Sequence, residues 1–193
     1  MSDSYLILIR HSVSQPVNGI DAQRWPLAAE GKERAAALAP RIAPYHPQII
    51  FTSYERKAVQ TAEMIAGELK VPYVLWPGLH EHDRTAIPYY DRATFLGLVQ
   101  DFFNRPDELV FGLETATAAL ARFRAALDDL LDAYPNRTIA AVSHATVLTL
   151  LLAPLSGADP FTFWDRLGMP AYAVLQRPGL ELVELVETVE LVP

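Results

Sequence analysis

The sequence contains no cysteine, and it has only 9 glycines beside 15 prolines among its 193 residues. The absence of cysteine excludes a disulfide scaffold, a thiolate metal site and a cysteine nucleophile. The glycine and proline contents exclude collagen-like or linker sequence, and 51% hydrophobic against 20% charged residues excludes intrinsic disorder. We therefore expect a single globular domain over residues 1–193 that needs no covalent cross-link to fold.

Positive charge and long apolar runs are also lacking. The net charge of -7 gives no broad basic surface, so nucleic acid is not expected as a partner. The longest apolar run, from Ala145 to Leu155, is shorter than the ~20 residues of a membrane-spanning helix and is interrupted by Thr146, Thr149 and Pro154. The amino end lacks the basic region of a signal peptide, and its apolar stretch stops at Arg10. These features predict a cytoplasmic protein that does not associate with membranes.

Short apolar runs alternate with amphipathic segments along the chain, which is the pattern of an α/β protein. The run over 5–9 is unbroken, as in strands that are buried on both faces of a parallel sheet. Pro40 is expected to kink or end the first helix. The sequence predicts strands at 5–9, 48–52, 71–76, 138–142, 172–176 and 182–187, and helices from Leu27, from about Arg56, over 115–134 and from about Val147.

Polar side chains follow four of the predicted strands at the point where each ends. They are Arg10 and His11, Ser53 and Arg56, Glu81, and Ser143 and His144. In open parallel sheets, ligands bind beyond the carboxyl ends of the strands, so these side chains are expected to meet in one crevice.

Two arginines, two histidines and a glutamate together suit a phosphoryl group. The planar guanidinium groups of Arg10 and Arg56 match phosphate oxygens. A neutral imidazole of either His11 or His144 can attack phosphorus and carry the phosphoryl group as a covalent intermediate. The Glu81 carboxyl can protonate the departing alkoxide. This scheme requires neither a metal ion nor an organic cofactor.

The stretch 80–83, His-Glu-His-Asp, is open to a different interpretation. These side chains are good ligands for zinc or manganese. His80 and His82 alternate along an extended segment and could point the same way, but two arginines in the same pocket would repel a divalent cation. We therefore expect no metal site here.

The sequence resembles the histidine phosphatase superfamily, the phosphoglycerate mutase-like proteins. The motif around Arg10 and His11 resembles its Arg-His-Gly signature, and the other motifs follow in the order of that family. They are Leu27–Gly31, similar to Leu-Thr-x-x-Gly; Ser53–Ala62, similar to Ser-x-x-x-Arg-x-x-x-Thr-Ala; Leu79–Glu81, similar to Leu-x-Glu; Glu114–Thr115, similar to the acidic start of a long helix; and Val142–Ala145, similar to Val-Ser-His-Gly.

The resemblance implies a three-layer α/β/α sandwich with a mostly parallel central sheet. It implies that His11 is the phosphorylated nucleophile and that Glu81 is the proton donor. It also implies that Arg10, Arg56 and His144 hold the phosphoryl oxygens. The expected activity is hydrolysis of a small phosphomonoester by a metal-independent phosphatase through a phosphohistidine, and the expected partner is a small phosphorylated substrate.

Two functions other than hydrolysis stay open, and two departures from the family pattern motivate the one without turnover. Ser12 and Ala145 stand where the family has glycine, so the backbone can approach a phosphate less freely there. A phosphomutase would use the same histidine but return the phosphoryl group to the product, and a phosphate-binding protein would have lost turnover.

Residues 84–113 are expected to form an inserted helical cap over the site. Phe95, Leu98, Val99 and Phe102 recur at helical spacing within this segment.

Overall fold

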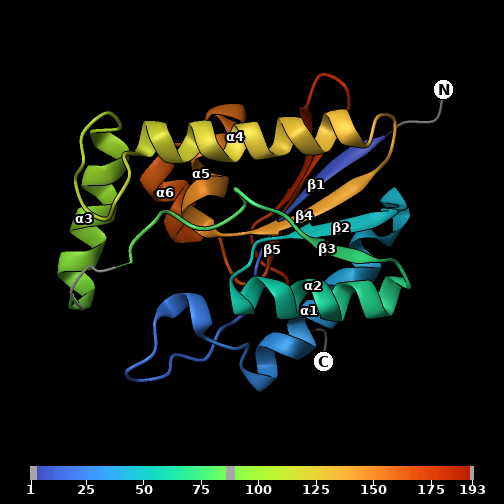
Figure 1. Cartoon of the computed structure of the whole chain (residues 1–193), viewed down its shortest axis with the longest axis horizontal. Helices are drawn as coiled ribbons and strands as arrows, with labels where there is room; N and C mark the ends of the chain where they lie inside the picture. Colours follow the sequence, from blue (N-terminus) through green and yellow to red (C-terminus); the bar gives the residue numbers. More distant parts are fainter. Residues whose placement is uncertain (1–3, 86–89, 192–193) are drawn as a thin grey trace.

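The computed structural model describes residues 4–85 and 90–191, and its centre is one mixed β-sheet (Figure 1). The strand order is β3-β2-β4-β1-β5-β6. The first four strands in this order are mutually parallel, whereas β5 runs antiparallel to β1 and β6 antiparallel to β5. The strands are β1 (Tyr5–Arg10), β2 (Ile49–Thr52), β3 (Tyr73–Leu75), β4 (Ile139–Ser143), β5 (Ala171–Gln176) and β6 (Glu181–Val186).

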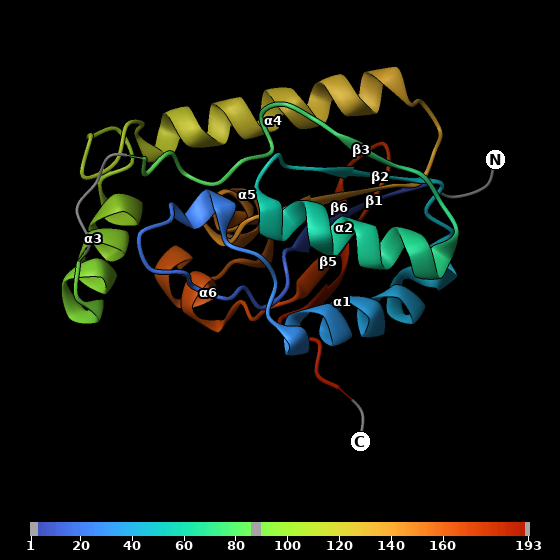
Figure 2. The same ribbon diagram turned by 60° about the horizontal axis from the view of Figure 1, so that its bottom comes forward.

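Helices cover both faces of the sheet, as Figures 1 and 2 show. One face is covered by α1 (Ala29–Ile42) and α2 (Arg56–Leu69). The other is covered by α4 (Ala116–Ala133), α5 (Ala145–Ser156) and α6 (Pro160–Arg166), with α3 (Arg92–Asn104) against α6 at one end. The three-layer α/β/α sandwich predicted from the sequence is confirmed.

The two hydrophobic cores arise from the alternation of side chains along the strands. In β1, Leu6 and Leu8 contribute to the core under α4 and α5, whereas Ile7 and Ile9 contribute to the core under α1 and α2. All four side chains are fully buried. This two-sided burial explains the unbroken apolar run of the sequence, because each face of the strand needs its own apolar residues.

The structure differs from the sequence prediction in several helices. Pro40 lies inside α1, which ends only at Ile42 and continues into the short 3-10 helix η2 (Ala43–Tyr45). A proline this close to the carboxyl end removes one hydrogen bond without breaking the remaining turn. A second 3-10 helix, η1, spans Ala22–Arg24.

The sequence analysis also misplaced the start of one helix and missed another helix. The fifth α-helix begins at Ala145 instead of about Val147, with His144 as its N-cap residue. Helix α6 was missed, although its start carries a recognisable signal: Pro160 is its first residue, and the Asp159 side chain accepts a hydrogen bond from the Thr162 N–H at 2.8 Å.

Within residues 4–85 and 90–191, no single helix has both the length and the hydropathy to cross a membrane. Only α5 and α6 taken together have that length and hydropathy, and the chain bends by 118° between these two helices.

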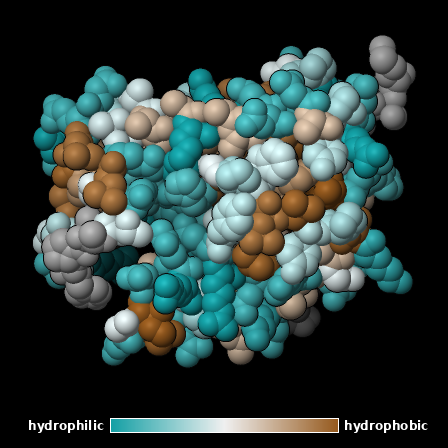
Figure 3. Space-filling view, in the orientation of Figure 1, coloured by the Kyte–Doolittle hydropathy of each residue, from teal (hydrophilic) through white to brown (hydrophobic). Residues whose placement is uncertain are grey.

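An apolar patch on the face shown in Figure 3 lies over the edge strand β3, whose Val74 and Leu75 are exposed. Neither residue belongs to the candidate site described below.

Candidate active site

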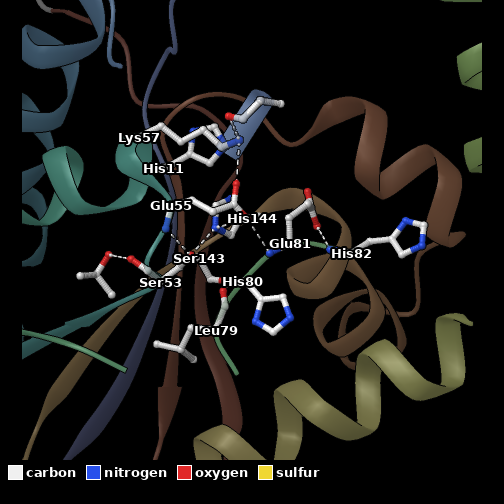
Figure 4. A network of polar contacts seen from close by, with 12 residues as sticks. His11, Ser53, Glu55, Lys57, Leu79, His80, Glu81, His82, Ser143 and His144 are labelled. Atoms are coloured by element: carbon white, nitrogen blue, oxygen red, sulfur yellow. Dashed lines mark hydrogen bonds and ion pairs between the residues drawn. The ribbon is translucent and has the colours of Figure 1, made fainter. Parts of the chain in front are cut away.

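The carboxyl ends of three neighbouring parallel strands bring the predicted side chains together. The His11 N–H donates to the Ser143 carbonyl at 2.9 Å, and the Ser53 N–H donates to the Val142 carbonyl at 3.1 Å. These bonds continue the ladders from β4 to β1 and to β2 beyond the last strand residues. The segments after the three strands are thereby held side by side at one edge of the sheet (Figure 4).

The loop after β1 is fixed against α1 and α2. The Ser12 N–H donates to the Thr61 hydroxyl at 3.0 Å. At Gly31, a Cβ atom would lie 2.0 Å from the Val13 carbonyl oxygen, so only glycine allows α1 to approach this loop so closely. The motif Leu27–Gly31 therefore positions the loop that carries the first histidine.

The imidazole of His11 is buried and has a defined orientation. Its Nδ1 lies 2.8 Å from the Ser12 carbonyl oxygen, which only accepts hydrogen bonds, so Nδ1 carries the proton and Nε2 keeps a free lone pair. Burial, followed by the positive charges nearby, lowers the pKa of His11 well below its usual range. The ring is therefore neutral at neutral pH, which is the form that can act as a nucleophile.

His144 lies beside His11, with the ring centroids 5.1 Å apart. Its Nε2 lies 2.9 Å from the Ser53 hydroxyl oxygen. Burial lowers the pKa of His144 well below its usual range, although the nearby Glu81 partly opposes this effect. The structure thus brings both predicted histidines to the same site.

Arg56 does not join this site. It is exposed at the first turn of α2, whereas the adjacent Lys57 is buried and directs its Nζ toward the histidines (Figure 4). Successive helix residues point about 100° apart, so only one of the two can face the sheet. The motif Ser-x-x-x-Arg counted from Ser53 reaches residue 57, which here is lysine. The placement of Arg56 among the phosphate ligands is therefore corrected: Lys57 is the cation that α2 contributes.

Lys57 is paired with a carboxylate that the sequence analysis did not single out. Its Nζ lies 2.9 Å from Glu55 Oε2 and donates to the Ala22 carbonyl at 3.0 Å. Both partners are buried, so removal of either one would leave an uncompensated charge in the interior. One signal in the sequence could have identified Lys57. Lys57 lies four residues before Thr61, and residues four apart lie on the same side of a helix, which here is the buried side of α2.

Glu81 reaches the site from the loop after β3. Its carboxylate accepts from the Thr146 N–H at 3.2 Å, near the start of α5, and from the His82 N–H at 2.9 Å. Burial raises the pKa of Glu81, but Arg84, His144 and the His82 N–H outweigh this effect and hold it below its usual range. The carboxyl group is therefore ionised at neutral pH before a ligand binds.

Two arginines flank Glu81 and the histidines. Arg10 donates to the Leu167 carbonyl, and its buried Nε has no acceptor among the residues that the structure describes. Burial lowers the pKa of Arg10 to about 10, so it remains a cation at neutral pH. Arg84 lies 3.5 Å from Glu81 Oε2, with its guanidinium 5.2 Å from the centre of the Phe95 ring. Arg84 belongs to the predicted cap segment, but its contact with Glu81 was not predicted.

Arg122 on α4 supports the loop that carries Glu81. Its guanidinium donates to the carbonyls of Gly78 at 2.8 Å and His80 at 3.0 Å. It also pairs with Glu114 at 2.6 Å. The acidic residue at the start of the long helix thus fixes the loop geometry and does not itself line the site.

The histidines of the 80–83 stretch point in different directions (Figure 4). His82 is only 2% exposed and stacks on Phe102, with ring centroids 4.2 Å apart. His80 is half-buried, and burial followed by Arg122 lowers its pKa. Over residues 4–85 and 90–191, no three His, Asp or Glu side chains are placed to hold a metal ion together.

Comparison with known proteins identifies the family of the chain. Residues 6–177 match the histidine phosphatase superfamily (branch 1). PhoE of Bacillus subtilis, an uncharacterized phosphatase, is 30% identical over 135 residues, which cover 70% of this chain and 67% of that protein.

Two solved structures have the same fold. A mycobacterial glucosyl-3-phosphoglycerate phosphatase is 20% identical, with a TM-score of 0.72 over 95% of this chain and 96% of that one. The phosphoserine phosphatase of Entamoeba histolytica, in complex with 3-phosphoglyceric acid, is 22% identical, with a TM-score of 0.74 over 96% and 98% of the two chains. The relatives are named as phosphatases, which is consistent with this protein being a phosphoric monoester hydrolase. The chain belongs to the histidine phosphatase superfamily.

Proposed function

We propose that this protein is a metal-independent phosphatase that hydrolyses a small phosphomonoester through a phosphohistidine on His11. The orientation of His11 carries this proposal. Its Nδ1–H is held by the Ser12 carbonyl, and its Nε2 keeps a lone pair. Its pKa lies well below the usual range, and the charges of Lys57 and Arg10 act on the ring. A neutral nucleophile next to cations is what attack on a negatively charged phosphoryl group requires.

In the first step, Nε2 of His11 forms a bond to phosphorus while the bond from phosphorus to the leaving oxygen breaks. Arg10 and Lys57 neutralise the phosphoryl oxygens, and His144 donates a hydrogen bond to them. Glu81 gives a proton to the leaving oxygen. Although the pKa of Glu81 is low before binding, the negative charge of the arriving phosphoryl group raises it, so that the carboxyl can take up this proton.

In the second step, water attacks phosphorus and the bond from phosphorus to His11 breaks. Glu81, now ionised, accepts a proton from the water. Inorganic phosphate leaves, and His11 returns to its neutral form. The same two residues thus serve both steps, as acid and base and as nucleophile and leaving group.

We assign residues 84–113 as a cap over this site within a single domain of residues 1–193. The support is the contact of Arg84 with both Glu81 and Phe95, and the stacking of His82 on Phe102. Residues 86–89 of this segment lie outside the described residues. A cap this short suits small substrates such as the 3-phosphoglyceric acid bound to the related structure. Measurement of phosphate release from a panel of small phosphomonoesters tests the proposed activity directly.

Removal of divalent cations is expected to leave activity unchanged. In the proposed mechanism, Arg10 and Lys57 supply the positive charge that other phosphatases take from metal ions. Release of phosphate from p-nitrophenyl phosphate should be the same before and after dialysis against EDTA. Loss of activity on chelation, followed by recovery with zinc or manganese, would contradict the mechanism.

Replacement of Lys57 is expected to be far more harmful than replacement of Arg56. Lys57→Gln removes a buried cation but keeps a hydrogen-bond donor for Glu55, so we expect kcat/KM for p-nitrophenyl phosphate to fall by about 10²-fold. The exposed Arg56→Gln should change kcat/KM by less than about threefold. Thermal unfolding of both variants controls for folding. A larger loss in Arg56→Gln would return Arg56 to the phosphate ligands.

A further inference from the structure

A carboxylate lies in the same pocket as the proposed phosphate ligands. Glu55 precedes α2 as its N-cap residue, but its side chain makes no capping hydrogen bond to the helix. It is only 6% exposed and is directed toward the histidines (Figure 4). Its Oε2 lies 2.9 Å from Lys57 Nζ, and its Oε1 accepts from the Glu81 N–H at 3.0 Å and lies 3.4 Å from His144 Nε2.

This arrangement is unfavourable for a fully ionised phosphoryl group. Lys57 is a proposed phosphate ligand, and its Nζ lies 2.9 Å from Glu55 Oε2, so a phosphoryl oxygen that Lys57 holds comes close to the Glu55 carboxylate. Two negatively charged oxygens repel one another in a site with little water. A protonated phosphoryl oxygen instead donates a hydrogen bond to the carboxylate, which turns the repulsion into a charge-assisted contact.

We propose that Glu55 makes the pocket selective for phosphoryl groups that carry one proton, by accepting a hydrogen bond from the P–OH. This inference rests on the proposed function, because it concerns the same pocket. The preferred substrate is then the monoanion of a phosphomonoester. Phosphoryl groups lose their second proton with a pKa of about 6, so binding weakens as the pH rises above that value.

The other charged and titratable groups that face Glu55 act on phosphate and sulfate alike. They are Lys57 from α2, His144 at the start of α5, and His80 and Glu81 from the loop after β3. Burial lowers the pKa of both His80 and His144 below the usual range, which favours the neutral form of each imidazole. The pKa of Glu81 is also lowered before a ligand binds. A bound anion raises it, but phosphate and sulfate do so alike, so the comparison of the two anions removes this contribution.

Sulfate and inorganic phosphate separate the effect of the proton on the anion from the effect of its shape, because they have the same shape but sulfate carries no proton in this pH range. Isothermal titration calorimetry measures the affinity of each anion at pH 6 and pH 8. Inorganic phosphate keeps a P–OH at both pH values, as the monoanion at pH 6 and as the dianion at pH 8, so for the unaltered protein it should bind at least about tenfold more tightly than sulfate at both.

The variant Glu55→Gln should bind sulfate at least about tenfold more tightly than the unaltered protein does. The control is Glu68→Gln, which removes the same charge from an exposed position of α2 and should behave like the unaltered protein. If Glu55→Gln does not fold, the comparison of phosphate with sulfate on the unaltered protein still decides the question.

Equal affinities for both anions at both pH values would overturn the selectivity and leave the proposed phosphatase intact. An unchanged sulfate affinity in folded Glu55→Gln would also overturn it. Failure of all three proteins to bind either anion would instead contradict the phosphate pocket, and with it both the proposed function and this inference.

Discussion

Replacing His11 with alanine is expected to lower kcat for p-nitrophenyl phosphate by about 10⁴-fold or more, because the variant has no group to receive the phosphoryl group. His11 is held just after the central strand β1 and by the Ser12 carbonyl. The neighbouring His144 has its Nε2 at the Ser53 hydroxyl, so it is not placed to substitute for the Nε2 of His11. Single-turnover measurements should show that the loss lies in the chemical step. Arg10 and Lys57 remain, so the affinity for inorganic phosphate should change much less than kcat.

His46→Asn is the matched control for this variant. His46 is exposed and follows η2, where it adopts a left-handed backbone conformation that asparagine tolerates. Its replacement should leave kcat and KM unchanged. If His11→Ala kept a substantial fraction of the activity, the covalent mechanism would be wrong, even though the chain belongs to the family.

Replacing Glu81 with glutamine is expected to affect substrates according to their leaving group. An alkyl phosphate needs a proton on the departing oxygen, and loss of a general acid costs about 10²–10⁴-fold in rate. The p-nitrophenolate ion leaves without a proton, so its release should slow by less than about tenfold. The glutamine side-chain oxygen can still accept from the Thr146 and His82 N–H groups, which preserves the local structure.

The ratio of the rates for an alkyl phosphate and p-nitrophenyl phosphate therefore measures the role of Glu81. Glu68→Gln should leave this ratio unchanged, because Glu68 lies exposed on α2. An equal loss for both substrates in Glu81→Gln would assign Glu81 to binding or structure instead of proton transfer.

The sequence predicted the α/β sandwich and the edge of the sheet at which the site forms. This succeeded because β1, β2 and β4 are buried on both faces, so their apolar runs and the polar residues that follow them are distinct in the sequence. The strand order and the antiparallel direction of β5 and β6 were not predicted. They depend on pairing between distant segments, which local patterns do not record.

The site itself was predicted less completely than the fold. Arg56 and Lys57 carry the same charge, so charge does not decide which of them faces the site. The direction of each side chain decides it, because successive helix residues point about 100° apart. The buried residues of α2 lie on one side of the helix, and Lys57 belongs to that side, so the pattern of buried residues identifies Lys57 as the one that faces the site. The contact of Arg84 with Glu81 was harder to predict, because it depends on how Arg122 and Glu114 hold the loop after β3.

The phosphohistidine is the central claim, and locating the phosphoryl group tests it most directly. The protein is mixed with substrate, quenched rapidly at alkaline pH because phosphohistidine is acid-labile, and mapped by mass spectrometry. The proposed mechanism predicts a phosphoryl group on His11, formed more slowly but at the same position in His144→Ala, and absent in His11→Ala. A phosphoryl group on His144 would contradict this assignment, and turnover without any phosphorylated histidine would contradict the covalent mechanism.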